Sequence, residues 1–283
     1  MVFMQQYIAV VDGDKRQKAL CEILKRQGLL ARLFFLNNET VLTDLAQLGA
    51  CKALVLPVPT TRNGETLNAP QLNPPLPLAT VLSALQPGTP VFTGGTAPCF
   101  AEFKNLNFCN LLAQEPLVLK NALATAEAAL AVVITQTPHT VFKSNVLLLG
   151  YGRIAQYLAK YLKNLGAAVT VAARNEVART KAATAGSTAL TFEQVEVYLP
   201  HFNVIVNTVP QTVLFKRQLL KVSPGCLLVD LASKPGGIDY KAAEILRLNT
   251  VQALGLPGKY SPNSAAQYMA EAITARLKEL SLI

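Results

Sequence analysis

Residues 146–174 read VLLLGYGRIAQYLAKYLKNLGAAVTVAAR. An apolar strand from Val146 to Leu149 leads into the sequence G-Y-G-R-I-A, which is followed by an amphipathic helix and a second apolar strand that ends at Arg174. The pattern G-x-G-x-x-A is weak evidence alone, but between a strand and a helix it is typical of a dinucleotide-binding β-α-β unit. The segment therefore predicts a Rossmann-like domain in the second half of the chain.

Each residue of the glycine-rich turn has a distinct physical task. We expect Gly150 to form the tight turn, Gly152 to let the backbone approach a pyrophosphate, and Ala155 to let the helix pack closely on the strand. Arg153 and Ile154 then begin a helix whose N-terminal N–H groups and positive dipole end attract phosphates. These residues are predicted to bind the pyrophosphate of a nicotinamide dinucleotide.

The end of the second strand indicates which dinucleotide binds. NAD-binding domains place a carboxylate there for the ribose 2′-hydroxyl, whereas this chain has Arg174, followed by Asn175. A guanidinium pairs with a 2′-phosphate that a carboxylate would repel. We therefore expect NADP as the cofactor, with NAD as the alternative. The competing interpretations are a β-α-β unit that binds nothing and an Arg174 that only faces water.

Composition limits the class of protein. The chain has 283 residues, of which 51% are hydrophobic and 15% charged, which suits two folded domains without long disordered tails. Five scattered cysteines and two histidines form no C-x-x-C or similar metal-binding spacing. We expect reduced thiols in a cytoplasmic protein and no metal site.

Charge and hydropathy argue against nucleic-acid and membrane partners. The formal net charge is +9, and residues 121–283 carry most of it, with 16 Lys and Arg against 9 Asp and Glu. No basic stripe interleaved with aromatic residues accompanies this charge, so an anionic cofactor and substrate explain it better than nucleic acid does. We find no secretory signal and no uninterrupted apolar run long enough for a membrane span.

Strands alternate with helices along the whole chain, which predicts an α/β protein with two Rossmann-like parallel-sheet domains. We expect an N-terminal domain over residues 1–120 with strands at 7–11, 31–36, 53–56 and 90–93. A hinge helix over 117–135 would lead into a dinucleotide-binding domain over 121–261, and a helix in 262–283 would complete the first domain. Such an arrangement leaves an interdomain cleft for the substrate.

Ligands of open parallel sheets bind beyond the C-terminal ends of the strands, and this rule selects further candidates. Three predicted strands, 204–207, 226–230 and 250–253, each run into a polar, glycine-rich or proline-rich loop. The residues expected to surround the nicotinamide are Thr208, Val209, Pro210, Leu231, Ala232, Gly255 and Pro257. His139 and His201 precede strands, so they should lie at the opposite edge, away from the chemistry.

The first domain offers its own strand-end groups, which suit a small carboxylate substrate. Hydroxyls, backbone N–H groups and cations are the partners that a carboxylate needs. The predicted substrate-binding residues are Arg16, Thr60, Thr61, Arg62 and Gly94, together with Lys259 from the second domain. Lys15 and Arg16 have a competing interpretation, which is that they face solvent in the first turn of a helix and bind no substrate.

Several longer segments resemble one known family. They are LLVDLASKPGGIDYKAAE (227–244), ALGLPGKYSPNSAAQ (253–267), VNTVP (206–210), VAARN (171–175), GYGRIAQ (150–156) and Thr125-Ala126-Glu127. Together they resemble the A subunits of bacterial dipicolinate synthase, strongly from residue 121 onward and in patches before it.

The resemblance implies an enzyme that oxidises a dihydrodipicolinate-type intermediate to pyridine-2,6-dicarboxylate during sporulation, in the cytoplasm of the mother cell. It also implies a flavoprotein-like partner, the B subunit of dipicolinate synthase, and it is compatible with a homo-oligomer. For such a small dicarboxylate substrate we expect Lys234 to act as a carboxylate clamp or acid/base. Asp230 or Glu127 would accept the proton. Each carboxylate also has a structural alternative, which is that Asp230 binds loop amides and that Glu127 pairs with a nearby donor.

Two other functions remain open on the sequence. The chain could be a non-catalytic subunit that binds a dinucleotide and organises a flavoprotein partner, since no histidine is placed for acid/base work. It could also be another NADP-dependent two-domain dehydrogenase, of the hydroxyacid, shikimate or folate type. The segments DLASKPGG and GLPG weigh against the latter.

Overall fold

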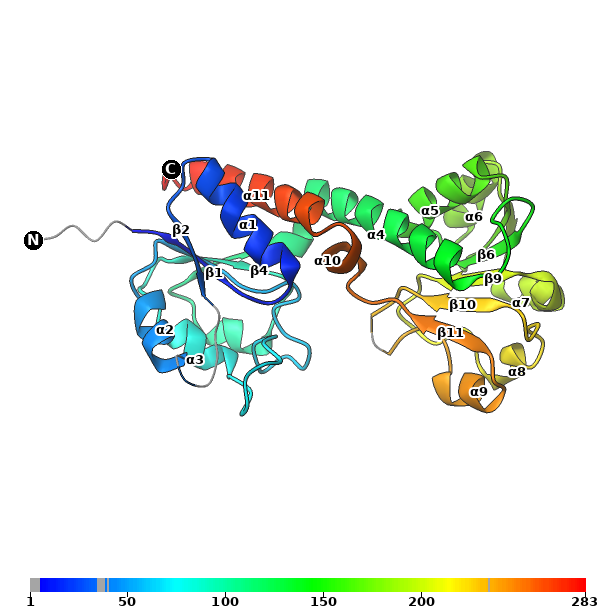
Figure 1. Ribbon diagram of the computed structural model, residues 1–283, viewed down its shortest axis with the longest axis horizontal. Coiled ribbons are helices and arrows are strands. Elements are labelled where there is room, and N and C mark those ends of the chain that lie inside the picture. The colour runs from blue at the N-terminus through cyan, green and yellow to red at the C-terminus, as the bar shows by residue number, and fades with distance from the viewer. Residues whose placement is uncertain (1–5, 35–38, 40, 234) are drawn as a thin grey trace, which may run out of the picture. The chain divides into compact units, whose positions relative to one another are not determined.

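The computed structural model describes residues 6–34, 39, 41–233 and 235–283. The chain forms two compact units, Met1–Asn121 with Ser261–Ile283 (unit 1) and Ala122–Tyr260 (unit 2). The division falls within the 22-residue helix α4, Glu115–Gln136. Both units are α/β structures with one parallel sheet each, so the predicted fold class is confirmed for the two sheets (Figure 1).

Unit 1 contains a five-stranded sheet in the order β2-β1-β3-β4-β5, in which every pair is parallel. Its strands are β1 (Ile8–Val11), β2 (Ala31–Phe34), β3 (Ala53–Val55), β4 (Pro90–Thr93) and β5 (Asn107–Asn110). Its helices are α1 (Lys15–Arg26), α2 (Val41–Leu48), α3 (Leu78–Ser83), η1 (Pro98–Glu102), η2 (Leu111–Ala113) and α11 (Pro262–Glu279). The C-terminal helix α11 lies along α1 and buries Ala266, Ala270 and Ile273 in the same core cluster (Figure 1).

Unit 2 contains a six-stranded parallel sheet in the order β11-β10-β9-β6-β7-β8. Its strands are β6 (Asn145–Leu149), β7 (Ala168–Ala172), β8 (Thr188–Leu190), β9 (Val204–Asn207), β10 (Leu227–Asp230) and β11 (Asn249–Gln252). Its helices are α5 (Arg153–Asn164), α6 (Glu176–Thr184), α7 (Phe192–Val195), η3 (Glu196–His201), α8 (Lys216–Leu219), α9 (Tyr240–Ile245) and α10 (Leu256–Tyr260). This is the doubly wound strand order, and it reverses direction between β6 and β9, where such folds bind their ligands.

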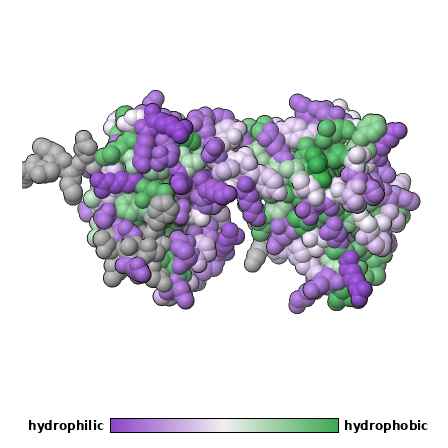
Figure 2. Space-filling view, viewed as in Figure 1, coloured by the Kyte–Doolittle hydropathy of each residue, from purple (hydrophilic) through white to green (hydrophobic). Residues whose placement is uncertain are grey.

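Apolar strand sequences explain the core of unit 2. Residues 146–149 of β6 are completely buried because helices cover both faces of a parallel sheet. On one face α5 contributes Leu158 and Leu162, and α4 contributes Ala129 and Val133. On the face seen in Figure 2, each unit mixes hydrophilic areas with smaller hydrophobic ones.

Some elements differ from the sequence-based expectations. Strands β5 and β8 were not expected, and both lie at sheet edges, where partly exposed residues produce no continuous apolar run. Residues 255–259 were expected to form a loop, but Leu256–Tyr260 forms α10. The last two positions of the strand expected at 31–36 lie outside the described residues.

Helix α4 is the one helix in the described ranges with the length and hydropathy of a membrane span, with a mean hydropathy of 1.8 over its most apolar window. Half of that window is buried, and Ala126, Ala129 and Val133 belong to the core of unit 2. Its packing is that of a core helix in a folded domain.

The buried thiols provide a test of the fold. Burial raises the pKa of Cys226 to about 12 and that of Cys51 to about 11. Since the thiolate is the reactive form, iodoacetamide at about pH 8 should leave both unmodified in the folded protein and label the partly exposed Cys99 first. Peptide mass spectrometry checks this order. Alkylation of Cys226 in the native protein as fast as in urea would contradict the fold.

Candidate functional site

The turn after β6 requires glycine at its first position. Gly150 has φ +86°, a left-handed conformation that side chains rarely adopt. A Cβ there would lie 2.7 Å from Thr208 Oγ1 and 2.9 Å from Val209 Cγ2. The Thr208 hydroxyl in turn donates to the Leu149 carbonyl over 2.9 Å, which fixes the loop after β9 against the end of β6. Gly150 therefore brings the two strands of the switch point together.

Gly152 shows the opposite environment. It is the N-cap residue of α5 and has φ −77°. If a Cβ were added to it, no heavy atom of the described residues, other than those of its two chain neighbours, would lie within 4 Å. Glycine has no side chain, so the N-cap residue makes no side-chain hydrogen bond to the first turn of α5. Open space in front of a helix N-terminus is what a pyrophosphate needs. Ala155, one turn into the helix, is completely buried against the sheet.

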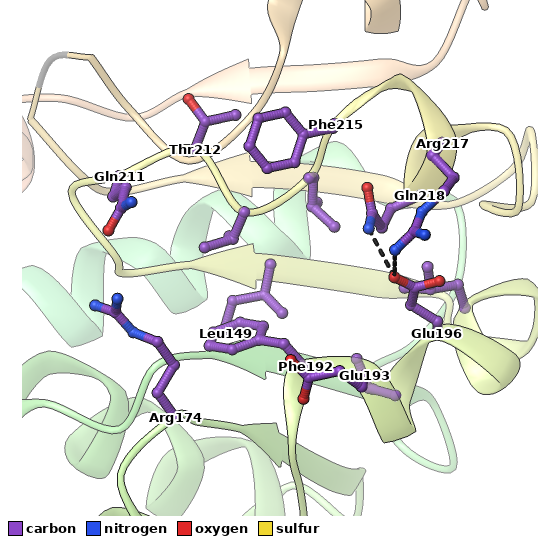
Figure 3. Close-up of a pocket in the computed structure, with 14 residues that line it drawn as sticks. Leu149, Arg174, Phe192, Glu193, Glu196, Gln211, Thr212, Phe215, Arg217 and Gln218 are labelled. Carbon is purple, nitrogen blue, oxygen red and sulfur yellow. Dashed lines mark hydrogen bonds and ion pairs between the residues drawn. The ribbon is translucent and has the colours of Figure 1, made fainter.

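A cavity of about 250 Å³ lies on the opposite side of the sheet from α5, next to the end of β7 (Figure 3). Its walls include Leu149 of β6, Phe192 and Leu199 from α7 and η3, and residues 211–215 of the loop after β9. Arg174 and Gln211 extend from two different loops on one side of the cavity (Figure 3). The lining thus combines apolar side chains with charged ones, which are Arg174, Glu193, Glu196 and Arg217.

The backbone beneath Arg174 is held by a second arginine. Arg179 Nη1 donates to the carbonyls of Ala173 over 2.8 Å and Arg174 over 2.6 Å. Arg174 itself is exposed. Asn175 accepts from the Val177 amide over 2.7 Å as the N-cap of α6, so its oxygen is already bonded. Arg174 is therefore the exposed cation of this turn.

Asp230 ends β10 with no exposed surface and accepts four hydrogen bonds. Asn207 Nδ2 and the Ala232 amide donate to Oδ1 over 2.8 and 3.0 Å. The Gly237 amide and the Tyr240 hydroxyl donate to Oδ2 over 2.8 and 2.7 Å. These contacts favour the structural alternative for Asp230 over the expected role as proton acceptor, because both oxygens are buried and occupied. They also occupy the amide of Ala232.

The loops after β9, β10 and β11 carry most of the remaining predicted residues of unit 2. Thr208 and Val209 are half-buried, and Pro210 is exposed. Leu231 donates its amide to the Asn207 carbonyl over 2.9 Å. Gly255 has φ +66°, Pro257 is buried in α10, and Lys259 is exposed. Glu127 is exposed on α4, and Lys234 lies outside the described residues.

The two histidines lie at the opposite edge, as predicted. The His201 carbonyl accepts from Asn145 Nδ2 over 3.2 Å, and Asn145 is the first residue of β6. His139 is exposed in the loop that precedes the same strand. Among the described residues no group of three or more His, Cys, Asp or Glu could hold a metal ion.

In unit 1 the loops after β1, β3 and β4 meet at the C-terminal edge of the sheet. Gly94 approaches Val58 so closely that a Cβ would lie 2.7 Å from the Val58 Cα. Thr60 Oγ1 accepts from the Gly94 amide over 2.7 Å and donates to the Pro57 carbonyl over 3.0 Å. Thr60 and Gly94 are therefore brought together as predicted neighbours, but the Thr60 hydroxyl is buried between two loops.

The expected cations of unit 1 differ in exposure. Arg16 is buried, binds Asp14 with a shortest distance of 2.7 Å and also donates to the Val58 carbonyl, so its guanidinium joins two loops. Arg62 is exposed and donates to Asn68 Oδ1 over 3.0 Å, whereas Thr61 accepts from the Gly64 amide. Burial raises the pKa of the nearby Asp12 carboxyl. Of the two arginines, Arg62 is the one accessible to a substrate.

Known proteins match both halves of the chain. Residues 7–112 match the family model for the N-terminal domain of the dipicolinate synthase A subunit, and residues 130–254 match that of shikimate / quinate 5-dehydrogenase. The A subunit of dipicolinate synthase from Bacillus subtilis (strain 168) is 26% identical over 289 residues, which is 96% of each chain. The chain is similar to that A subunit along nearly its whole length. The predicted resemblance is confirmed.

Two crystal structures show the same fold. The A subunit of dipicolinate synthase from Bacillus halodurans superposes with a TM-score of 0.82 at 23% identity, covering 96% of this chain and 97% of that one. The corresponding chain of dipicolinate synthase from Bacillus subtilis has a TM-score of 0.81 at 24% identity, covering 99% and 98%. With the dehydrogenase family match, they confirm a dinucleotide-binding, dehydrogenase-like fold.

The sequence-based selection missed three residues that organise this site. Arg179, Gln211 and Tyr240 were not singled out, although Tyr240 lies within the quoted segment 227–244. The adjacent glycines of that segment were the available signal. Gly236 has φ +84°, and a Cβ on Gly237 would lie 2.1 Å from Asn207 Nδ2.

Gly237→Ala should therefore destabilise the protein, because the methyl group forces Asn207 away from Asp230. We expect a loss of roughly 3 kcal/mol in the free energy of unfolding, measured by urea denaturation. Gly225→Ala is the matched control, since no heavy atom of the described residues beyond its neighbours lies within 4 Å of its Cβ. Equal stability of the two variants would refute the packing described for Gly237.

Proposed function

We propose that this chain is the A subunit of a dipicolinate synthase, and that it uses NADP to oxidise a dihydrodipicolinate-type intermediate to dipicolinate during sporulation. The observation that carries the proposal is the edge of unit 2, where the open space at Gly152 and the exposed Arg174 follow the ends of two adjacent strands, β6 and β7. A flavoprotein-like partner (the B subunit of such a synthase) and a location in the cytoplasm of the mother cell are parts of this proposal, and they rest on the resemblance to the A subunits.

The residues present fit a dinucleotide. The first turn of α5 would bind the pyrophosphate, and the apolar cavity beside Leu149 would hold the adenosine. Arg174 would pair with the ribose 2′-phosphate, and the Arg179 contacts with the backbone hold that turn in place. When bound, NADP supplies the hydride acceptor. The same residues except Arg174 would serve NAD.

The protein's share of the reaction is to orient the substrate and to accept a proton. Loss of a hydride and a proton converts a dihydropyridine ring into an aromatic ring, so a modest base suffices. Exposed cations, namely Lys259 and Arg62, are proposed partners for the two carboxylates, and Lys234 remains a proposed clamp or acid/base. With Asp230 buried and occupied, Glu127 is the carboxylate that we propose as the proton acceptor.

The purified chain, combined with its flavoprotein-like partner, NADP and the dihydrodipicolinate-type intermediate, should form dipicolinate and reduced nicotinamide together. Glu127→Gln should lower turnover about a hundredfold, which is the usual contribution of a general base, and leave NADP affinity unchanged. Absence of dipicolinate in the complete mixture would refute the enzymatic proposal.

A second function, a non-catalytic dinucleotide-binding subunit, is favoured by the two observations that Asp230 is fully occupied and that both histidines lie at the far edge. It predicts that Glu127→Gln has no effect on dipicolinate formation by the complex. In that case NADP binding would still be required for assembly with the partner.

Arg174→Asp should weaken NADP binding about a hundredfold and leave NAD binding unchanged or stronger, because a carboxylate repels the 2′-phosphate and accepts a bond from the 2′-hydroxyl. Isothermal titration calorimetry with both dinucleotides measures this. Arg217→Ala is the control, because Arg217 lies at the same cavity but is paired with Glu196 at 2.6 Å. Equal loss of NADP and NAD affinity in R174D would mean that Arg174 is structural.

Gly152→Ala should abolish binding of both dinucleotides, because its methyl group enters the space proposed for the pyrophosphate. The free energy of unfolding should change by less than about 0.5 kcal/mol, as for Gly225→Ala, since neither Cβ meets a described neighbour. Undiminished NADP affinity in the folded G152A variant would place the pyrophosphate elsewhere.

A further inference from the structure

Strands β9 and β10 end in two loops that converge on one buried carboxylate. Asp230 has no exposed surface, and its four hydrogen-bond donors are neutral groups. Burying a carboxylate is costly unless donors compensate for its lost hydration. Bonds to an ionised group are stronger than neutral ones, so each donor is held firmly.

The two oxygens of Asp230 serve different parts of the chain. Oδ1 accepts from Asn207 Nδ2. The Asn207 side chain also makes two bonds to Val209: Nδ2 donates to its carbonyl over 2.9 Å, and Oδ1 accepts from its amide over 3.1 Å. Oδ2 binds Gly237 and Tyr240, at the far end of the loop 231–239. One carboxylate therefore joins the loop after β9 to both ends of the loop after β10.

Backbone bonds continue this connection. The Gly237 carbonyl accepts from the amides of Val213 and Leu214 over 2.9 and 3.0 Å, and the Asp239 amide donates to the Leu214 carbonyl over 2.9 Å. Residues 211–215 also line the cavity proposed for adenosine. The position of residues 237–239 is thus coupled to the loop that borders the proposed cofactor site.

Tyr240 ties Asp230 to α9 through its hydroxyl. It is the first residue of that helix and lies half-buried. Burial, followed by the bond to Asp230, raises the pKa of its hydroxyl above the ordinary value of 10.0. The hydroxyl therefore stays protonated and keeps donating throughout the neutral range.

We propose that Tyr240 is a positioning residue, which acts through Asp230 to hold residues 231–233 and 235–239 in the arrangement needed for turnover. Its hydroxyl donates to Asp230 Oδ2, so in this proposal it acts through that carboxylate and not through contact with the substrate. The expected effect of Tyr240 on turnover rests on the proposed function, whereas its effect on the position of the loop does not.

Tyr240→Phe removes the donor and preserves the ring, so it tests the proposal with little risk to folding. Hydrogen–deuterium exchange of the cofactor-free chain should show faster exchange confined to residues 231–239 and 211–215. In the complete synthase, kcat should fall about tenfold, as expected for one lost bond to a buried charge, while the KM for NADP stays within about twofold. NADPH affinity, measured by its fluorescence, should likewise be unchanged.

Tyr198→Phe, on the exposed η3 segment of the same unit, is the matched control and should match the wild type in every measurement. Asp230→Asn is a second variant of nearly identical shape, and Y240F should add little to it, because both remove the same connection. The proposal would be overturned if hydrogen–deuterium exchange in Y240F stayed at the wild-type rate. It would also be overturned if exchange rose throughout unit 2 together with a large loss of Tm. A KM for NADP that rises as much as kcat falls would also overturn it. If the loop responds but the wild type forms no dipicolinate, the proposed function fails and the structural connection stands.

Discussion

The turn after β6 is the constraint on which the rest of the site depends. Its left-handed glycine permits the close contact of Gly150 with Thr208 and Val209, and this contact brings β6 and β9 together at the point where the strand order reverses. The next glycine leaves open space before a helix N-terminus. A larger residue at either position would change this geometry, at Gly150 through collision and strain and at Gly152 through filling the space. The proposed cofactor site follows from these two positions.

The charged residues at the sheet edge of unit 2 are of two kinds: exposed ones that are proposed to bind ligand, and buried ones that hold the loops in position. The exposed cation Arg174 faces outward, whereas the carboxylate Asp230 is buried and compensated by neutral donors. Arg179 plays the complementary role, because its guanidinium binds two backbone carbonyls beneath Arg174. In the proposal the exposed Arg174 binds the phosphate of the cofactor, whereas the buried Asp230 holds loops in position. In unit 1, Arg16 likewise joins loops through Asp14 and Val58.

Local sequence patterns predicted the parts of this structure that depend on local physics. The spacing of glycines and the apolar runs of β6, β7 and β9 were sufficient for the fold class and for the edge that carries the candidate residues. Short edge strands such as β8 were missed because half-exposed residues produce no periodic signal. The role of Asp230 could not be decided from sequence, because its partner Asn207 is 23 residues away and only the fold brings them together. The position of Lys234 falls outside the described residues, so its role stays a prediction.

Direct titration of the wild-type chain with NADPH and NADH, measured by calorimetry, tests the central claim most directly. The account predicts binding of NADPH to a single site per chain, with NADH at least about tenfold weaker for want of the 2′-phosphate contact. No heat with either dinucleotide, at concentrations where the folded chain is intact, would contradict the assignment of a cofactor site to this edge of the sheet.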